Sequence, residues 1–203
     1  MSVRLVLASN NAKKLAEMQA LFAPLGVELV AQGALGIGEA EEPHGTFVEN
    51  ALAKARHAAA ACGGPAIADD SGLCVDALGG APGVLSARYA TLFGGAKDDA
   101  ENNSVLLKQL EGRSDRRARF VSVLVALRAA DDPEPLVAMG RWHGEVLAGL
   151  RGEGGFGYDP LMYIPELGRT VAELDAQEKN RLSHRAQAAR QMLQLMREVW
   201  RLG

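Results

Sequence analysis

The sequence predicts an α/β fold built on a mixed β-sheet. Short β-prone runs alternate with helical patterns along the chain, and no internal repeat, linker or low-complexity tract interrupts them. In the second half, two apolar runs face each other across a polar turn, which predicts a long hairpin and an extended sheet between two lobes. At 203 residues the chain is one large domain or two closely packed lobes.

The composition excludes several classes of protein. The chain is 48% hydrophobic and 23% charged, which is ordinary for a globular protein. Its net charge of -3 argues against binding to nucleic acid but not against a mononucleotide, which needs only a few local cations. No apolar run approaches the ~20 residues of a membrane span, and the first strand is too short for a signal sequence. We therefore expect a cytoplasmic enzyme that binds neither membrane nor nucleic acid.

The first elements are a strand, a polar turn and a helix. Residues 3–8 are apolar and β-prone, and residues 9–11 form the turn. Apolar side chains at helical spacing predict a helix over residues 13–22. A second strand is predicted over residues 27–31, after a proline and a glycine that end the helix. Glycines, prolines and glutamates then mark residues 33–45 as an acidic loop.

A capping box begins the next helix. Thr46 and Glu49 are spaced to cap a helix that runs to about Cys62. Pro65 to Ala68 then reads as a short buried strand, residues 69–72 as a turn, and residues 73–75 as another strand. Two cysteines occur, Cys62 and Cys74, and neither has the spacing of a metal or redox motif, so we expect buried thiols.

The second half contains the predicted hairpin. A helix over residues 99–110 precedes two strands, residues 119–128 and 136–146, which can pair across the intervening turn. Thr170 begins a second capping box, and the last helix begins near Ser183.

Asp69 and Asp70 are the first candidates for chemistry. They follow a buried strand directly, and ligands of open α/β sheets usually bind where strands end. Adjacent side chains of an extended chain point in opposite directions, so at most one of the two faces a given site. Mg²⁺ prefers carboxylate oxygens, typically one or two from the protein together with substrate phosphates. The alternative is an Asx-type turn closed by Ser71 and Gly72.

The acidic loop could supply a second carboxylate to the same metal. Glu39, Glu41 and Glu42 are the candidates, and nothing local favours one of them. The alternative is an ordinary solvated acidic loop, which is how such a run most often behaves.

The turn after the first strand could bind phosphate. Residues 9–14 join a strand to a helix, and a helix N-terminus attracts anions through its backbone N–H groups. Lys13 or Lys14 could complete such a site, although the segment is not a Walker A loop. The alternative is a polar turn in which an asparagine caps the helix.

A glycine-rich aromatic loop and a cationic helix start could bind a base. Four glycines surround Phe156 and Tyr158 within residues 152–160, and such a loop can present an aromatic face for stacking. His184 and Arg185 lie in the first turn of the last helix, where the helix dipole disfavours cations. That conflict suggests a functional reason for the two cations. The alternatives are that residues 152–160 form an ordinary turn and that His184 and Arg185 are ordinary surface charges.

Together these segments resemble the inosine triphosphate pyrophosphatase family from end to end. Six separated segments match the family's motifs in the right order: residues 7–14, 45–51, 66–73, 79–89, 155–160 and 183–185. The resemblance implies an elongated mixed sheet with two helical lobes flanking a central substrate cleft, in a single domain over residues 1–203. One departure is Ser9-Asn10, where relatives often carry Thr-Gly, and an asparagine restricts the turn more than a glycine would.

The resemblance also implies an activity. Members cleave non-standard purine nucleoside triphosphates (ITP, dITP and XTP) to the monophosphate and pyrophosphate with Mg²⁺, and are commonly homodimers. The resemblance implies that Asp70 is the general base and a magnesium ligand and that Glu42 is the second magnesium ligand. The substrate-binding residues implied for this chain are Ser9, Asn10, Asn11, Ala12, Lys13 and Lys14 for the triphosphate, Ser71, and Phe156, Gly157, Tyr158, Asp159, Lys179, His184 and Arg185 for the base.

Two other functions stay open. A Maf-type pyrophosphatase shares the fold but prefers other nucleotides, and the Ser183-His184-Arg185 and Gly155-Phe156-Gly157-Tyr158 motifs speak against it. A nucleotide-binding module without catalysis is disfavoured by the retained aspartates and lysines.

Overall fold

The computed structural model describes residues 3–202 and has the predicted α/β fold. In that part of the chain seven strands form one sheet in the order β2-β1-β3-β4-β5-β6-β7. The helices and strands are β1 Val3–Leu7, α1 Ala12–Phe22, β2 Val27–Ala31, α2 Phe47–Cys62, β3 Ala66–Val75, α3 Asp99–Gln109, β4 Arg117–Leu127, β5 Leu136–Val146, β6 Met162–Ile164, β7 Arg169–Thr170, α4 Ala176–Leu182 and α5 His184–Val199. Short 3₁₀ helices connect several of them, the longest being η4 at Gly83–Phe93.

The chain divides into two compact units. The first comprises Met1–Asp70, Ser122–Gly140 and Ser183–Gly203, and the second comprises Ser71–Val121 and Arg141–Leu182. β3, β4 and β5 each begin in one unit and end in the other.

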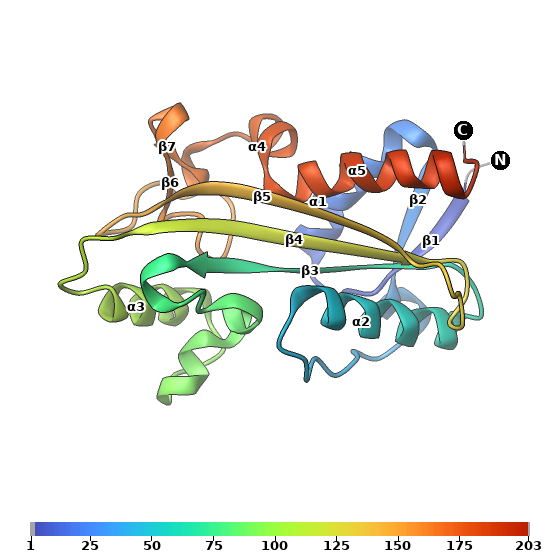
Figure 1. Ribbon diagram of the computed structural model, residues 1–203, viewed down its shortest axis with the longest axis horizontal. Coiled ribbons are helices and arrows are strands. Elements are labelled where there is room, and N and C mark those ends of the chain that lie inside the picture. Colours follow the sequence, from blue (N-terminus) through green and yellow to red (C-terminus); the bar gives the residue numbers. More distant parts are fainter. Residues whose placement is uncertain (1–2, 203) are drawn as a thin grey trace. The chain divides into compact units, whose positions relative to one another are not determined.

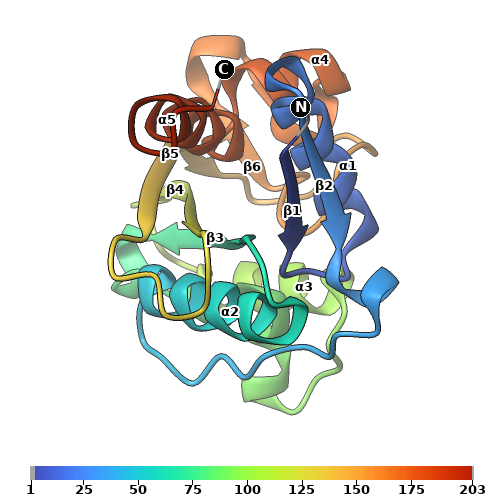
Figure 2. The ribbon, with the colours of Figure 1, turned by 90° about the vertical axis from the view of Figure 1, so that its right-hand side faces the viewer.

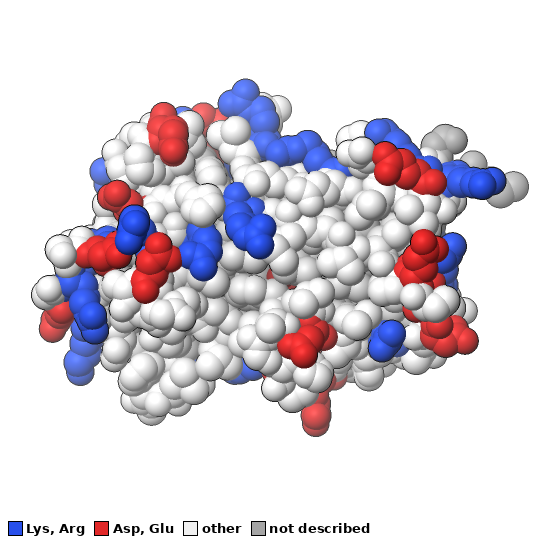
Figure 3. Space-filling model, in the orientation of Figure 1, with Lys and Arg blue, Asp and Glu red and all other residues white. Residues whose placement is uncertain are grey.

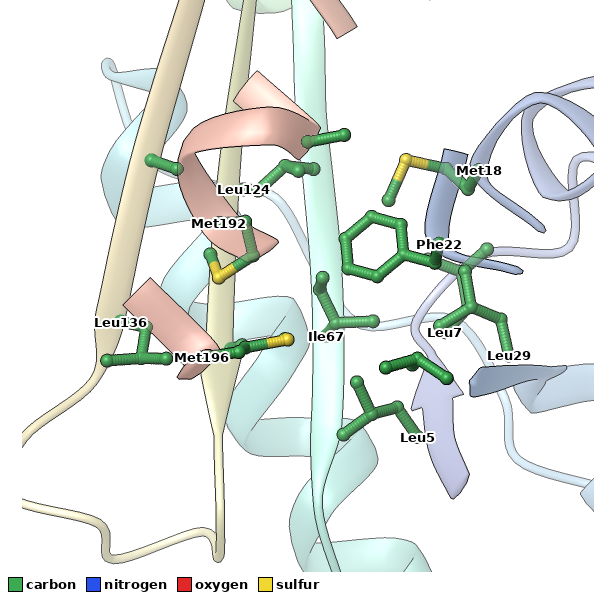
Figure 4. Close-up of a cluster of buried hydrophobic side chains, with 14 of the residues drawn as sticks. Leu5, Leu7, Met18, Phe22, Leu29, Ile67, Leu124, Leu136, Met192 and Met196 are labelled. Atoms are coloured by element: carbon green, nitrogen blue, oxygen red, sulfur yellow. The ribbon is translucent and has the colours of Figure 1, made fainter. Parts of the chain in front are cut away.

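In the first unit, helices cover both faces of the sheet. β1 pairs in parallel with β2, with Leu5 opposite Leu29, and with β3, with Leu7 opposite Ile67. α2 lies on one face and α5 on the other (Figures 1 and 2). The side chains of α1 and α5 that face the sheet are apolar and bury a core against β1 and β3. Figure 4 shows Phe22, Met192 and Met196 converging on Ile67 in this core.

The second unit has its own core under antiparallel strands. Val146 of β5 lies opposite Met162 of β6, and β6 continues to β7 in the same antiparallel manner. Leu106 of α3, Trp142 and Met162 belong to one buried cluster. Each unit therefore has a hydrophobic core of its own beneath the residues that the sequence predicts as functional.

The segment around the aspartate pair differs from its prediction. Ala66 to Val75 is one continuous strand, so Asp69 and Asp70 lie inside β3 rather than in a turn between two short strands. The Asp-Asp-Ser-Gly composition suggested a turn, but β3 is buried along nearly its whole length, and tertiary packing overrides local propensity. The thiol prediction holds for Cys74, which is buried, and fails for Cys62, which is half-buried at the end of α2.

The predicted helix caps are observed, and α1 begins one residue before its predicted start. The Asn11 side chain accepts a hydrogen bond from the Lys14 N–H (3.0 Å), so α1 begins at Ala12. Ser183 caps α5 through the Ala186 N–H (3.1 Å), and Thr170 forms a complete capping box with Glu173. Thr46 caps α2 through the Glu49 N–H (3.3 Å).

Figure 3 shows, on one face of the molecule, Lys and Arg side chains interspersed with Asp and Glu, in agreement with the small net charge of -3. Across residues 3–202, no helix is long and apolar enough to span a bilayer.

Candidate active site

One group of charged side chains gathers around Asp70 in the first unit. Lys54 of α2 places its Nζ 2.8 Å from Asp70 Oδ1 and 2.6 Å from Glu42 Oε1. The same ammonium donates to the backbone carbonyl of Asp69 (3.1 Å). Glu42 is therefore the acidic-loop residue that shares the Lys54 ammonium with Asp70, whereas Glu39 and Glu41 are exposed.

Burial determines the electrostatics of this group. Burial raises the pKa of Asp70, and the nearby Lys54 ammonium only partly offsets that effect. Burial alone would lower the pKa of Lys54, but the carboxylates of Asp70 and Glu42 bring it above its ordinary value. Among residues 3–202, nothing donates a hydrogen bond to the buried Oδ2 of Asp70. An acceptor oxygen next to a fixed ammonium thus lies ready for a proton or a cation.

Asp69 is the centre of a second buried group. Its Oδ2 lies 2.9 Å from Lys14 Nζ and 3.3 Å from both Nε and Nη2 of Arg185. Its Oδ1 accepts a hydrogen bond from Ser122 Oγ (2.7 Å), and Arg185 also pairs with Glu17 of α1. Burial opposes the charge of Asp69, but Lys14 and Arg185 outweigh it and hold the pKa of that carboxyl well below its usual range.

The two aspartates face opposite sides of β3, as expected for adjacent residues of a strand. Asp70 meets α2, whereas Asp69 meets α1 and α5, and α2 and α5 lie on opposite faces of the sheet (Figure 1). The pair therefore divides into two environments.

A separate group in the second unit surrounds Phe156. Lys179 of α4 lies with its Nζ 4.5 Å from the centre of the Phe156 ring and 2.8 Å from Asp159 Oδ2. Asp159 Oδ2 also accepts from the Phe156 N–H (2.9 Å). Gly155 has φ +73°, and an added Cβ would overlap Asp159 Oδ2, so this position requires glycine.

The loop is also held from α3. The Gly157 N–H donates to Asp99 Oδ2 (2.8 Å), and its carbonyl accepts from Asn103 Nδ2 (2.9 Å). The Tyr158 hydroxyl donates to the carbonyl of Ser86 (2.8 Å). These contacts hold the backbone of the glycine-rich loop that carries the Phe156 ring.

The structure brings together some predicted residues and not others. Lys14, Glu42, Asp70 and Arg185 join the ion pairs of the first unit, and Phe156, Gly157, Asp159 and Lys179 form the group in the second. The remaining predicted residues lie elsewhere: Ser9, Asn10, Asn11, Ala12 and Lys13 around the start of α1, Ser71 within β3 after Asp70, Tyr158 in the glycine-rich loop, and His184, buried, at the start of α5.

Sequence reasoning missed four residues in these groups. Lys54, Ser122, Asp99 and Asn103 touch predicted site residues, although no motif points to the last three. For Lys54 a signal existed, because a lysine interrupts the alanine-rich face of α2 one turn after the buried Asn50.

Comparison with known proteins identifies the family. Residues 5–195 match the model of the Ham1 family. The chain belongs to the Ham1 family. The resemblance found in the sequence is thereby confirmed.

Relatives of this Ham1-family chain match it over nearly its whole length. A protein of Leptothrix cholodnii named dITP/XTP pyrophosphatase is 69% identical over 212 residues, covering 99% of this chain and all of that protein. A protein of Methylibium petroleiphilum with the same name is 68% identical, covering 98% and 99%. Among solved structures, a HAM1 protein from Coxiella burnetii matches with a TM-score of 0.89 at 48% identity, covering 97% of this chain and 100% of that one.

Proposed function

We propose that this chain hydrolyses ITP, dITP and XTP between the α and β phosphates, releasing the monophosphate and pyrophosphate. The observation that carries the proposal is the Glu42–Lys54–Asp70 group, in which a buried carboxylate keeps an accepting oxygen beside a fixed ammonium. The names of the relatives, dITP/XTP pyrophosphatase, support it. The enzyme is a nucleoside triphosphate pyrophosphatase, and it removes non-standard purine nucleotides before they enter DNA or RNA.

The residues fit a magnesium ion. Within residues 3–202 no three His, Cys, Asp or Glu side chains group as a metal site, but Mg²⁺ often takes only one or two protein carboxylates and completes its shell with waters and phosphates. Asp70, with its unpartnered Oδ2, and Glu42 would hold the ion. When bound, the ion would offset the negative charge of the phosphates.

The chain's own groups supply proton transfer and phosphate binding. Asp70 acts as the general base that orients the attacking water and accepts its proton. Lys54 keeps Asp70 and Glu42 in place through its two ion pairs. The N-terminus of α1, with Lys13 and Lys14, binds the triphosphate.

Base selection uses the second group and the start of α5. The Phe156 ring stacks on the purine, held by Lys179 and Asp159. His184 and Arg185 present donors to a 6-oxo group, and a 6-amino group would leave such donors unpaired. We also propose that the enzyme acts in the cytoplasm as a homodimer, which light scattering on the purified protein would test.

A nucleotide panel tests the function. Pyrophosphate release is measured from ITP, dITP, XTP, ATP and dTTP, each with Mg²⁺ and with a chelator. We expect release from the first three at least tenfold faster than from ATP, and none with the chelator. A preference for dTTP would indicate the Maf-type activity, and nucleotide binding without release would indicate a non-catalytic module.

A further inference from the structure

Asp69 carries contacts that the proposed reaction does not use. Its side chain is fully buried, and it connects β3 to three other elements: α1 through Lys14, β4 through Ser122 and α5 through Arg185. Lys14 lies in the phosphate-binding segment, and Arg185 lies at the base-reading helix start. One carboxylate thus holds a cation from each segment.

These contacts exclude a metal-binding role for Asp69 in this arrangement. Both of its oxygens already accept from protein donors, Oδ1 from Ser122 and Oδ2 from Lys14 and Arg185. A magnesium ion would have to displace two cations that the carboxylate already neutralises, the buried Arg185 and the half-buried Lys14. Asp69 also points to the opposite face of β3 from Asp70, so the two cannot ligate one ion without breaking the strand.

We propose that Asp69 is a positioning residue that holds Lys14 and Arg185 in a fixed relation, so that one carboxylate orients both the phosphate-binding and the base-reading cation. This inference rests on the proposed function. Without the carboxylate charge, the two cations that share Oδ2 become like charges at close range. The two side chains would move apart. Part of the free energy of nucleotide binding would then be spent on bringing them back to the positions in which they bind the nucleotide.

The test variant is Asp69→Asn, which keeps the shape and an acceptor for Ser122 but removes the charge. We expect KM for ITP to rise at least tenfold, kcat to change less than threefold, and the preference for ITP over ATP to fall about tenfold. The Mg²⁺ concentration for half-maximal rate should stay within twofold of wild type. Calorimetry in EDTA should show at least tenfold weaker ITP binding. Asp131→Asn, at an exposed aspartate, is the matched control and should behave as wild type.

Each other outcome is decisive. A rise in the Mg²⁺ requirement equal to that of Glu42→Gln would make Asp69 a metal ligand and overturn the proposal. An equal loss of kcat/KM for ITP and ATP, accompanied by a lower Tm, would leave only a structural role and overturn it too. If wild type released no pyrophosphate from ITP, the proposed function would fail; an active wild type with unchanged KM and preference in Asp69→Asn would sink the positioning role alone.

Discussion

Asp69 and Asp70 are neighbours in one strand, yet their pKa values move in opposite directions. Lys14 and Arg185 overcome the burial of Asp69 and hold its pKa below the usual range, while burial raises the pKa of Asp70 despite the single Lys54 ammonium. When the pKa values of two carboxyl groups differ in this way, the group with the lower pKa stays charged and the other can exchange a proton. Lys14 and Arg185 therefore keep Asp69 charged and occupied, which leaves Asp70 as the aspartate of the pair that can act in the reaction.

The first prediction tests that division with two variants of the Asp70 group. Asp70→Asn removes the accepting oxygen's basicity, so kcat for ITP should fall by roughly 10²–10⁴, the contribution of a positioned base. Nucleotide affinity in EDTA should stay within threefold, because the binding groups lie elsewhere. Glu42→Gln should raise the Mg²⁺ concentration for half-maximal rate. Pyrophosphate release and calorimetry measure these quantities.

The matched control for Glu42→Gln is Glu41→Gln, one residue away on the same loop but exposed. It should leave the Mg²⁺ requirement unchanged. Near-normal kcat in Asp70→Asn would remove the base assignment, and an equal effect of the two glutamine variants would remove the assignment of Glu42.

At the scale of elements, the start of α5 depends on a glycine in β5. Gly140 is buried, and an added Cβ would overlap the backbone carbonyl oxygen of His184 and lie 2.8 Å from the N atom of Ala188. Glycine inside a strand often marks such a close backbone approach. The absence of one methyl group thus sets how closely α5, with His184 and Arg185, packs on the sheet.

The second prediction follows from that contact. Gly140→Ala should lower the free energy of unfolding by about 1–3 kcal/mol through overpacking, and it should lower kcat/KM for ITP by displacing His184 and Arg185. Urea unfolding and steady-state kinetics measure the two effects. Gly149→Ala is the control, because its Cβ would meet nothing within 4 Å and its φ is not positive. Similar behaviour of the two variants would show that α5 is not held in this way.

The third prediction concerns the turn between β4 and β5. Hydrogen bonds from the Arg128 side chain, helped by the backbone N–H groups of Arg128 and Glu134, lower the pKa of Asp132 to about 2 from 3.8. Because the folded pKa is the lower one, this stabilisation is present above pH ~3.8 and is lost as pH falls toward 2. Asp132→Asn should cost about 1 kcal/mol at pH 7, since Arg128 is half-exposed, and nearly nothing at pH 2. Urea unfolding across pH tests it, and a pH-independent difference would contradict it.

The same elements show what local sequence can predict. Asn11, Thr170 and Ser183 were predictable as helix caps, because a cap is a contact between residues three apart. The turn at Asp69-Asp70 was predicted wrongly, because what keeps Ala66–Val75 extended is burial against distant segments. Local rules fail where long-range packing decides the conformation.

At the scale of the molecule, each site group joins segments that are far apart in sequence. The Asp69 group alone takes Lys14, Ser122 and Arg185 from three different elements. The family resemblance predicted Asp70, Glu42 and the glycine-rich loop. It did not predict Lys54 or Ser122, whose roles depend on which side chain the fold places beside each carboxylate.

The fourth prediction is that nucleotide binding, and with it base recognition, changes the thermal stability of the whole protein. A ligand that binds only the folded state at 100 times its Kd adds about 2.7 kcal/mol to stability, which for a chain of 203 residues raises Tm by roughly 5–10 °C. In EDTA, where no turnover is expected, ITP should produce such a shift and ATP at the same concentration should not. Differential scanning calorimetry measures it. Because both nucleotides carry the same triphosphate, equal shifts would mean that phosphate contacts alone supply the affinity, and that discrimination arises in the reaction rather than in binding.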